Sequence, residues 1–232
     1  MKIVLALEGM DGAGKSSLAR FVARLCEENG QICTRIGRRT GNVTSGIARI
    51  TDLLNEEGPR LVSHTSVFLR LAREYQRAHL AAAAPPGIVV LDRFALSIHA
   101  LARLNGQDVD LLLPFLKEIT VRANLYATVF VHCPFNVAWK RVQRRNRGRP
   151  LQRGWSERLL SRMGDYLEEE FRHGMLTGQQ WEVDNSGTLE EAQKQIEGYL
   201  RTHLELAQRE QLQSSAEAER SVMSGRGVSG EW

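Results

Sequence analysis

A single short motif limits most strongly what this chain can fold into. Residues 9–16 read GMDGAGKS and match the pattern G-x-x-x-x-G-K-[ST] at every fixed position. Glycines in such a loop let successive backbone N–H groups point at phosphate oxygens, and the following helix presents its positive N-terminal end to the same anion. A chance glycine-rich turn is the alternative. Because an apolar run at 3–7 precedes the motif and helically spaced apolar residues follow it, we expect a buried strand, a phosphate loop and a helix.

This loop contains the expected ligands of a nucleotide and a metal ion. The Lys15 ammonium should reach the β- and γ-phosphates, and the Ser16 hydroxyl should ligate Mg²⁺. We therefore expect ATP as the phosphoryl donor and Mg²⁺ as the cofactor. The loop residues predicted to bind ATP are Gly9, Asp11, Gly12, Ala13, Gly14, Lys15, Ser16 and Ser17.

Apolar runs and helical patterns alternate along the chain. Short apolar runs predict further strands near residues 31–36, 87–94, 126–134 and 181–183. Helical spacing predicts helices near residues 15–29, 43–57, 63–84, 136–145, 155–171 and 188–207. This alternation indicates a three-layer α/β fold, with a largely parallel sheet flanked by helices. We expect one domain over residues 1–207 and a polar, loosely ordered tail over residues 208–232.

Composition argues against several other classes of protein. Of 232 residues 42% are hydrophobic, enough for the core of one domain, and the net charge of +4 is small for a nucleic-acid-binding protein. No apolar run approaches the roughly 20 residues that cross a bilayer. Cys26, Cys33 and Cys133 are odd in number and widely spaced, which suits buried thiols better than a zinc site or a disulfide framework. These features predict a cytoplasmic protein with no nucleic-acid or membrane partner.

Asp92 and Arg93 stand at the end of a predicted buried strand. Ligands bind along this carboxyl edge in open α/β sheets. Asp92 is a candidate to support Mg²⁺ through water, or to accept the proton of an attacking hydroxyl. Arg93 is a candidate contact for the acceptor or the transferring phosphoryl group. An ion pair that caps the strand is the structural alternative, but the nearby phosphate loop favours a catalytic role for both residues.

A basic segment interrupted by glycine and proline follows the predicted helix at 136–145. We expect a short mobile lid there, at about residues 144–154, that closes over a polyphosphate. Arginines brought in by such closure neutralise charge in the transition state and help exclude water. Arg145 and Arg149 are the candidate catalytic residues, and Arg144 is a candidate ATP contact. A solvated basic helix face and a nucleic-acid patch are the alternatives.

Four segments resemble one known family. They read ALEGMDGAGKSSLARFVARL, VVLDRFALS, CPFNVAWKRVQRRNR and VDNSGTLEEAQKQI. Over most of residues 1–200 the chain is similar to the thymidylate kinases, within the P-loop nucleoside monophosphate kinases. This resemblance implies a P-loop NTPase fold of the nucleoside and nucleotide kinase type, with a short basic lid. It also implies Mg²⁺-dependent phosphoryl transfer from ATP to thymidylate or a close analogue, nucleotide substrates and a homodimer.

The resemblance assigns roles to individual residues. Asp11 corresponds to the loop aspartate that contacts the sugar of the acceptor in the family. Asn185 begins the turn at 185–187 that lies by the adenine, which implies a contact with ATP. Phe94 stands where the family has the tyrosine of its Asp-Arg-Tyr strand end.

The chain departs from the family around the expected acceptor site. Residues 34–40 read TRIGRRT where the family usually reads TREPGGT, so Arg35 is kept. Phe68 matches the aromatic residue that stacks on the acceptor base, but four residues later Ala72 stands where the family has arginine, and the nearby arginines are Arg70 and Arg73. The predicted acceptor-binding residues are Asp11, Arg35, Phe68, Arg73 and Arg93.

Two other functions are weighed against nucleotide phosphorylation. Related deoxynucleoside kinases keep a glutamate after the second strand to take the proton of a hydroxyl acceptor, but Ile36 stands in that region among several arginines. This favours an anionic acceptor, although Asp92 could serve a nucleoside or another small hydroxylated molecule. The second rival is a P-loop NTPase that is not a kinase, and the compact lid expected here counts against it.

Overall fold

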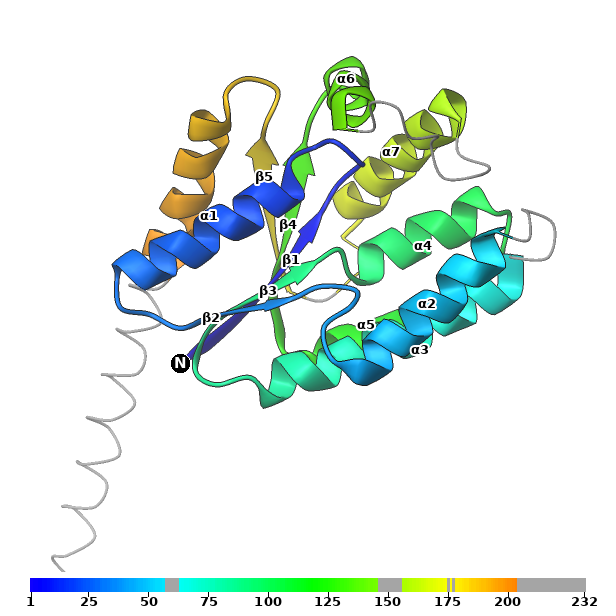
Figure 1. The fold of residues 1–232 in the computed structure, drawn as a ribbon, viewed down its shortest axis with the longest axis horizontal. Helices are drawn as coiled ribbons and strands as arrows, with labels where there is room; N and C mark the ends of the chain where they lie inside the picture. The colour runs from blue at the N-terminus through cyan, green and yellow to red at the C-terminus, as the bar shows by residue number, and fades with distance from the viewer. Residues whose placement is uncertain (57–62, 146–155, 175, 177, 204–232) are drawn as a thin grey trace, which may run out of the picture.

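The computed structural model describes residues 1–56, 63–145, 156–174, 176 and 178–203 (Figure 1). Five parallel strands form one sheet in the order β2-β3-β1-β4-β5. Their bounds are β1 Lys2–Glu8, β2 Cys33–Ile36, β3 Gly87–Asp92, β4 Leu125–His132 and β5 Gln179–Asp184. The sequence-based prediction of a parallel α/β sheet is confirmed. The predicted tail and nearly all of the predicted lid lie outside the described residues.

Helices cover both faces of this sheet (Figure 1). Helix α1 and a helix over residues 189–203 lie on one face, and α2 to α5 lie on the other. The bounds are α1 Lys15–Glu28, α2 Asn42–Glu56, α3 Ser63–Ala83, α4 Ala95–Leu104, α5 Leu113–Arg122, α6 Phe135–Arg145 and α7 Glu157–Arg172. In the described part of the chain, no helix has the length and apolar character needed to span a membrane. The three-layer arrangement is the one that alternating strands and helices predict.

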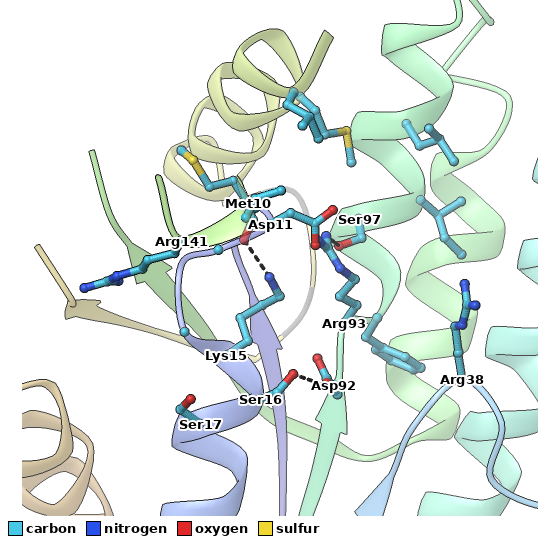
Figure 2. Close-up of a pocket in the computed structure, with 18 of the residues that line it drawn as sticks. Met10, Asp11, Lys15, Ser16, Ser17, Arg38, Asp92, Arg93, Ser97 and Arg141 are labelled. Atoms are coloured by element: carbon cyan, nitrogen blue, oxygen red, sulfur yellow. Dashed lines mark hydrogen bonds and ion pairs between the residues drawn. The ribbon is translucent and has the colours of Figure 1, made fainter. Parts of the chain in front are cut away.

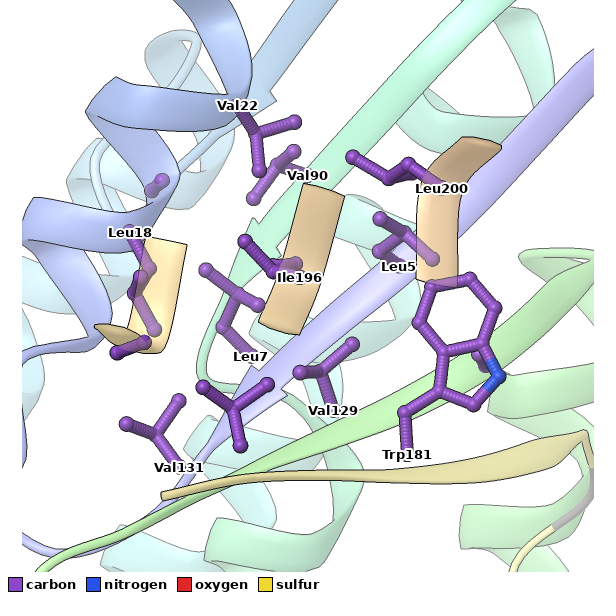
Figure 3. Packing of buried hydrophobic residues seen from close by; sticks show 14 of the residues in the cluster. Leu5, Leu7, Leu18, Val22, Val90, Val129, Val131, Trp181, Ile196 and Leu200 are labelled. Atoms are coloured by element: carbon purple, nitrogen blue, oxygen red, sulfur yellow. The ribbon is translucent and has the colours of Figure 1, made fainter. Parts of the chain in front are cut away.

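The first face is closed by aliphatic side chains from elements far apart in the sequence. Leu18 and Val22 of α1 pack against strand residues, together with Ile196 and Leu200 (Figure 3). Trp181 of β5 lies in the same buried cluster. Burial of such side chains contributes about 1.5–3 kcal/mol each, so this cluster fixes α1 on the sheet and with it the loop that precedes α1.

Strand β2 begins at Cys33, later than the predicted start at residue 31. Gly30 has a φ of +64° and ends α1. The Gln31 amide then donates to the Cys26 carbonyl at 2.8 Å. Because this amide satisfies an orphan carbonyl at the end of the helix, the chain joins the sheet only afterwards.

The register of the central strands places two predicted site segments side by side. Leu7 of β1 pairs with Asp92 of β3. The phosphate loop follows β1 directly, and Arg93 follows β3. Because parallel strands end at the same edge of a sheet, both segments meet at the carboxyl edge.

Candidate active site

A cavity of about 850 Å³ opens along this edge, between the phosphate loop and helices α3, α4 and α7 (Figure 2). Its volume lies in the range of small-molecule sites, which hold ligands in about 300–1,000 Å³. The lining combines the loop, the end of β3 and a row of arginines with apolar side chains such as Met10 and Met163. The cavity therefore offers both anion-binding and apolar surface.

The conformation of the phosphate loop depends on its glycines. Gly9, Gly12 and Gly14 have φ values of +135°, +85° and +102°. A Cβ on Gly12 would lie 2.3 Å from the Ala138 carbonyl oxygen, and one on Gly14 would lie 2.1 Å from Asn185 Nδ2. The loop thus needs glycine both for its left-handed backbone and for its close contact with α6 and Asn185.

Gly12→Ala is expected to abolish nucleotide binding and to lower the free energy of unfolding by more than the roughly 1–2 kcal/mol that a left-handed alanine costs. The physical reason is the added contact with backbone at Ala138. Gly30→Ala is the matched control, because Gly30 also has a positive φ but nothing lies within 4 Å of the added Cβ. Urea unfolding and nucleotide titration of both variants test this. Equal losses in the two variants would contradict it.

Lys15 is buried and turned back toward the loop. Its Nζ donates to the Met10 carbonyl at 2.7 Å (Figure 2). Burial lowers the pKa of Lys15 to about 7, with further repulsion from Arg93, although Asp11, Asp92 and Glu8 oppose the shift. Lys15 therefore binds its proton weakly while no phosphate is present, and a bound phosphate anion should raise the pKa of Lys15 again.

Nucleotide binding should therefore take up a proton above pH 7. In the free protein Lys15 has a pKa of about 7, far below its ordinary 10.5. The folded protein thus binds the Lys15 proton more weakly than the unfolded chain does. The contribution of Lys15 to the free energy of unfolding is therefore most unfavourable below pH 7 and improves as the pH rises toward 10.5. Calorimetric titration with ADP near about pH 8.5, in buffers of different ionisation enthalpy, should show uptake of close to one proton. Uptake that persists in Lys15→Met would rule out Lys15 as its source.

Ser16 and Asp92 meet at the ends of their elements. Ser16 Oγ donates to Asp92 Oδ2 at 2.9 Å (Figure 2). Mg²⁺ prefers oxygen ligands and usually keeps several waters, so one hydroxyl and one carboxylate suffice on the protein side. These two residues therefore fit the expected metal ion.

Arg93 and Asp11 form an ion pair beside Lys15. Arg93 Nη2 lies 2.6 Å from Asp11 Oδ1, and Arg93 Nη1 donates to Ser97 Oγ at 3.2 Å. The guanidinium of Arg93 holds the pKa of Asp11 well below its usual range, with Lys15 contributing. Arg93 itself has a φ of +58°, an uncommon conformation for a non-glycine residue. The end of β3 thus turns so that Asp92 and Arg93 contact different parts of the loop.

Glu8 is a buried residue that the sequence analysis did not select. It ends β1, and its carboxylate accepts from the Phe94 amide at 2.7 Å and from the Ser97 amide at 3.2 Å. The Ser97 hydroxyl also donates to it. Burial raises the pKa of Glu8. The acidic residue at the end of an otherwise apolar strand was the available signal, and its role is to hold the start of α4 against β1.

Arg77 of α3 is a second residue that the sequence analysis did not select. It is fully buried and donates to three carbonyls: that of Ile36 at 2.7 Å, of Asp92 at 3.1 Å and of Arg93 at 2.7 Å. It also pairs with the buried Glu74. Charged residues at 70, 73, 74 and 77 share one helix face, and this spacing was the available signal. Arg77 therefore ties the ends of β2 and β3 to α3.

On the nucleotide side the structure brings Asn185 to the phosphate loop. Its side-chain amide donates to the Ala13 carbonyl at 2.6 Å. Arg145 lines the cavity, whereas Arg144 is exposed and lies outside the lining. Arg149 lies outside the described residues.

Comparison with known proteins gives the family. The sequence model of the thymidylate kinases matches residues 7–196. The chain belongs to the thymidylate kinase family. A "Probable thymidylate kinase" from Archaeoglobus fulgidus is 26% identical over 154 residues, which cover 65% of this chain and 74% of that protein. Membership makes this protein an ATP-dependent nucleotide kinase that transfers a phosphoryl group to a nucleoside monophosphate.

The acceptor residues expected of a thymidylate kinase do not all reach the cavity. Arg73 lines it, as do Asp11 and Arg93. Phe68 is 60% exposed and, like the exposed Arg35, is absent from the lining. The step of two residues from Phe68 to Arg70 turns the helix by about 200°, so a cavity-facing Arg70 places Phe68 on the opposite face of α3. Arg38 and Arg70, which were not selected, line the cavity instead.

Proposed function

We propose that this kinase transfers the γ-phosphoryl group of ATP, with Mg²⁺, to the phosphate of thymidylate or a close analogue. The observation that carries the proposal is the meeting of Lys15, the Ser16–Asp92 pair and the Arg93–Asp11 pair at one edge of the sheet. The first two suit a nucleotide phosphate with its metal ion. The third stands where an acceptor phosphate must approach.

The residues of the cavity serve two purposes, which are binding of the substrates and electrostatic stabilisation of the transferring group. Phosphoryl transfer gains mainly from positioning and from charges placed around the transferring group. Lys15 is the buried cation of the phosphate loop, and Ser16 with Asp92 would hold Mg²⁺, which when bound neutralises charge on the phosphates. Arg93, oriented by Asp11, would bind the acceptor phosphate. Arg145, and Arg149 if the lid closes as the sequence predicts, would bring positive charge to the transferring group.

The pairing of the carboxylates supports an acceptor that is already anionic. Three described carboxylates line the cavity: Asp11, Glu74 and Asp92. Asp11 pairs with Arg93, Glu74 pairs with two arginines, and Asp92 accepts from Ser16. A hydroxyl acceptor needs a carboxylate that is free to take its proton. A phosphate acceptor needs cations, which this cavity has in excess.

A coupled ADP-release assay with ATP and Mg²⁺ tests this function. The acceptors are thymidylate, other nucleoside monophosphates, the matching nucleosides and none. We expect rapid turnover of one monophosphate, with thymidylate the first candidate, and little with nucleosides. Turnover of nucleosides alone would assign the proton-accepting role to Asp92, and hydrolysis that needs no acceptor would overturn the kinase assignment.

A homodimer and a cytoplasmic location stay predictions. Support for a second copy comes from exposed apolar side chains on the adjoining helices α2 and α3, where Val43, Ile50, Leu53 and Phe68 are each at least 50% exposed. Sedimentation equilibrium tests the dimer, since a mass near the 26.1 kDa of one chain would contradict it.

A further inference from the structure

A second group of charged residues lines the cavity away from the phosphate loop. Arg38 follows β2, and Arg70 and Arg73 lie on α3. The reaction chemistry described above uses Lys15, Asp92 and Arg93, and of these three arginines only Arg73 has a predicted task, in binding the acceptor.

Positive charge exceeds negative charge in this group. Arg38 and Arg39 share the single carboxylate of Asp52, at 3.2 and 2.8 Å. On α3, two further arginines, at positions 73 and 77, likewise share the carboxylate of Glu74. Among the described residues Arg70 makes no ion pair, and its Nε donates only to Ser66 Oγ at 3.3 Å. Counted together with Arg39 and Arg77, five arginines thus lie around two carboxylates.

Arg70 is the member with least compensation. Its guanidinium is partly buried, and burial together with the neighbouring Arg73 and Arg38 lowers the pKa of Arg70 to about 10. A guanidinium binds carboxylate and phosphate through paired hydrogen bonds, which are stronger than bonds to neutral groups. An oxyanion from a ligand would therefore supply the partner that the protein itself does not.

This group is separate from the reaction centre. In the sheet β3 lies between β2 and β1, so the ends of β2 and β1 are about 10 Å apart. The charges that act on Arg70 are those of Arg73, Arg38, Glu74 and Asp52, whereas those acting on Lys15 are Arg93, Asp11, Asp92 and Glu8. Figure 2 shows Arg38 on the far side of Arg93 from Lys15. An acceptor phosphate placed beside the γ-phosphoryl group therefore lies near Lys15 and Arg93, and not near Arg70.

We propose that Arg70, Arg73 and Arg38 form a subsite for a second anionic group of the acceptor, a carboxylate or phosphate distinct from the phosphate that is phosphorylated. The inference rests on the proposed function, because that function places the reacting phosphate beside Arg93. Phe68 is absent from the cavity lining, so the aromatic residue expected to stack on a base is not at this end, and Phe94 is the aromatic side chain that does line the cavity. The preferred acceptor is thus a nucleoside monophosphate with added negative charge on its base or sugar.

Calorimetric binding of three defined ligands tests the subsite. They are thymidylate, thymidine 3′,5′-bisphosphate, with the second anion on the sugar, and 5-carboxy-2′-deoxyuridylate, with the second anion on the base. Of the two ligands that carry a second anion, we expect at least one to bind at least about ten-fold more tightly than thymidylate. Charge-assisted hydrogen bonds increase affinity by roughly this factor. Arg70→Met should remove the advantage while changing thymidylate affinity less than about three-fold. The ligand that binds more tightly shows whether the second anion of the preferred acceptor is on its base or on its sugar.

The control is Arg172→Ala, which removes an exposed arginine on α7 that is outside the cavity lining. It should leave all three affinities unchanged. The proposal is overturned if neither ligand binds more tightly than thymidylate, or if the advantage persists in Arg70→Met. Arg70-dependent binding without turnover of any monophosphate would support the subsite and count against the proposed function, so the two failures are distinguishable.

Discussion

Lys15→Met is expected to lower kcat/KM by about 10²–10³-fold, the loss typical of removing one group that stabilises transition-state charge. Lys15 is the buried cation of the phosphate loop, and its Nζ is held by the Met10 carbonyl where phosphates are expected to bind. The same change should leave the ligand-free protein at least as stable, because burial disfavours the Lys15 ammonium. Steady-state kinetics and urea unfolding measure the two effects separately.

The control for this prediction is Lys140→Ala, an exposed lysine on α6. It should change neither activity nor stability. A Lys15→Met protein that loses stability along with activity would show that the lysine supports the fold, and one that keeps full activity would remove Lys15 from the reaction.

The second large effect is expected at Arg77. Arg77→Ala should lower the free energy of unfolding by about 3–5 kcal/mol, the range for breaking a buried ion pair on one side. The variant leaves three carbonyls without their donor and takes one of the two arginines from the buried Glu74. Because two of those carbonyls belong to Asp92 and Arg93, kcat should also fall. Urea unfolding followed by circular dichroism measures the first effect.

A triple variant separates the two causes of this loss. Arg77→Met combined with Glu74→Leu and Arg73→Met removes the buried carboxylate together with both of its arginines, so it should be more stable than Arg77→Ala. Its activity should stay low, because the ends of β2 and β3 still lack the donor. If Arg77→Ala unfolds like the parent protein, Arg77 does not fix the strand ends.

Much of the nucleotide side could be predicted from the sequence because it is local. Residues 9–16 are contiguous, so their glycines, the helix N-terminus and Lys15 come together whatever surrounds them. The meeting of Asp92 and Arg93 with this loop could be predicted for a related reason. Parallel strands that alternate with helices end at one edge of the sheet, so a polar pair after a buried strand reaches the same edge as the loop. The fold class follows from the same alternation.

The lining of the proposed acceptor end of the cavity was decided by the tertiary structure. Phe68 and Arg70 are two residues apart, and only the rotation of α3 against the sheet selects Arg70 for the cavity. Glu8 bonds to Phe94 and Ser97, and Arg77 bonds to Ile36, across separations of 86, 89 and 41 residues. Local patterns fix conformations within a loop or a helix turn. Contacts across such distances depend on how whole elements pack, because burial of many apolar side chains sets the rotation of each helix and only then the partner of each charge.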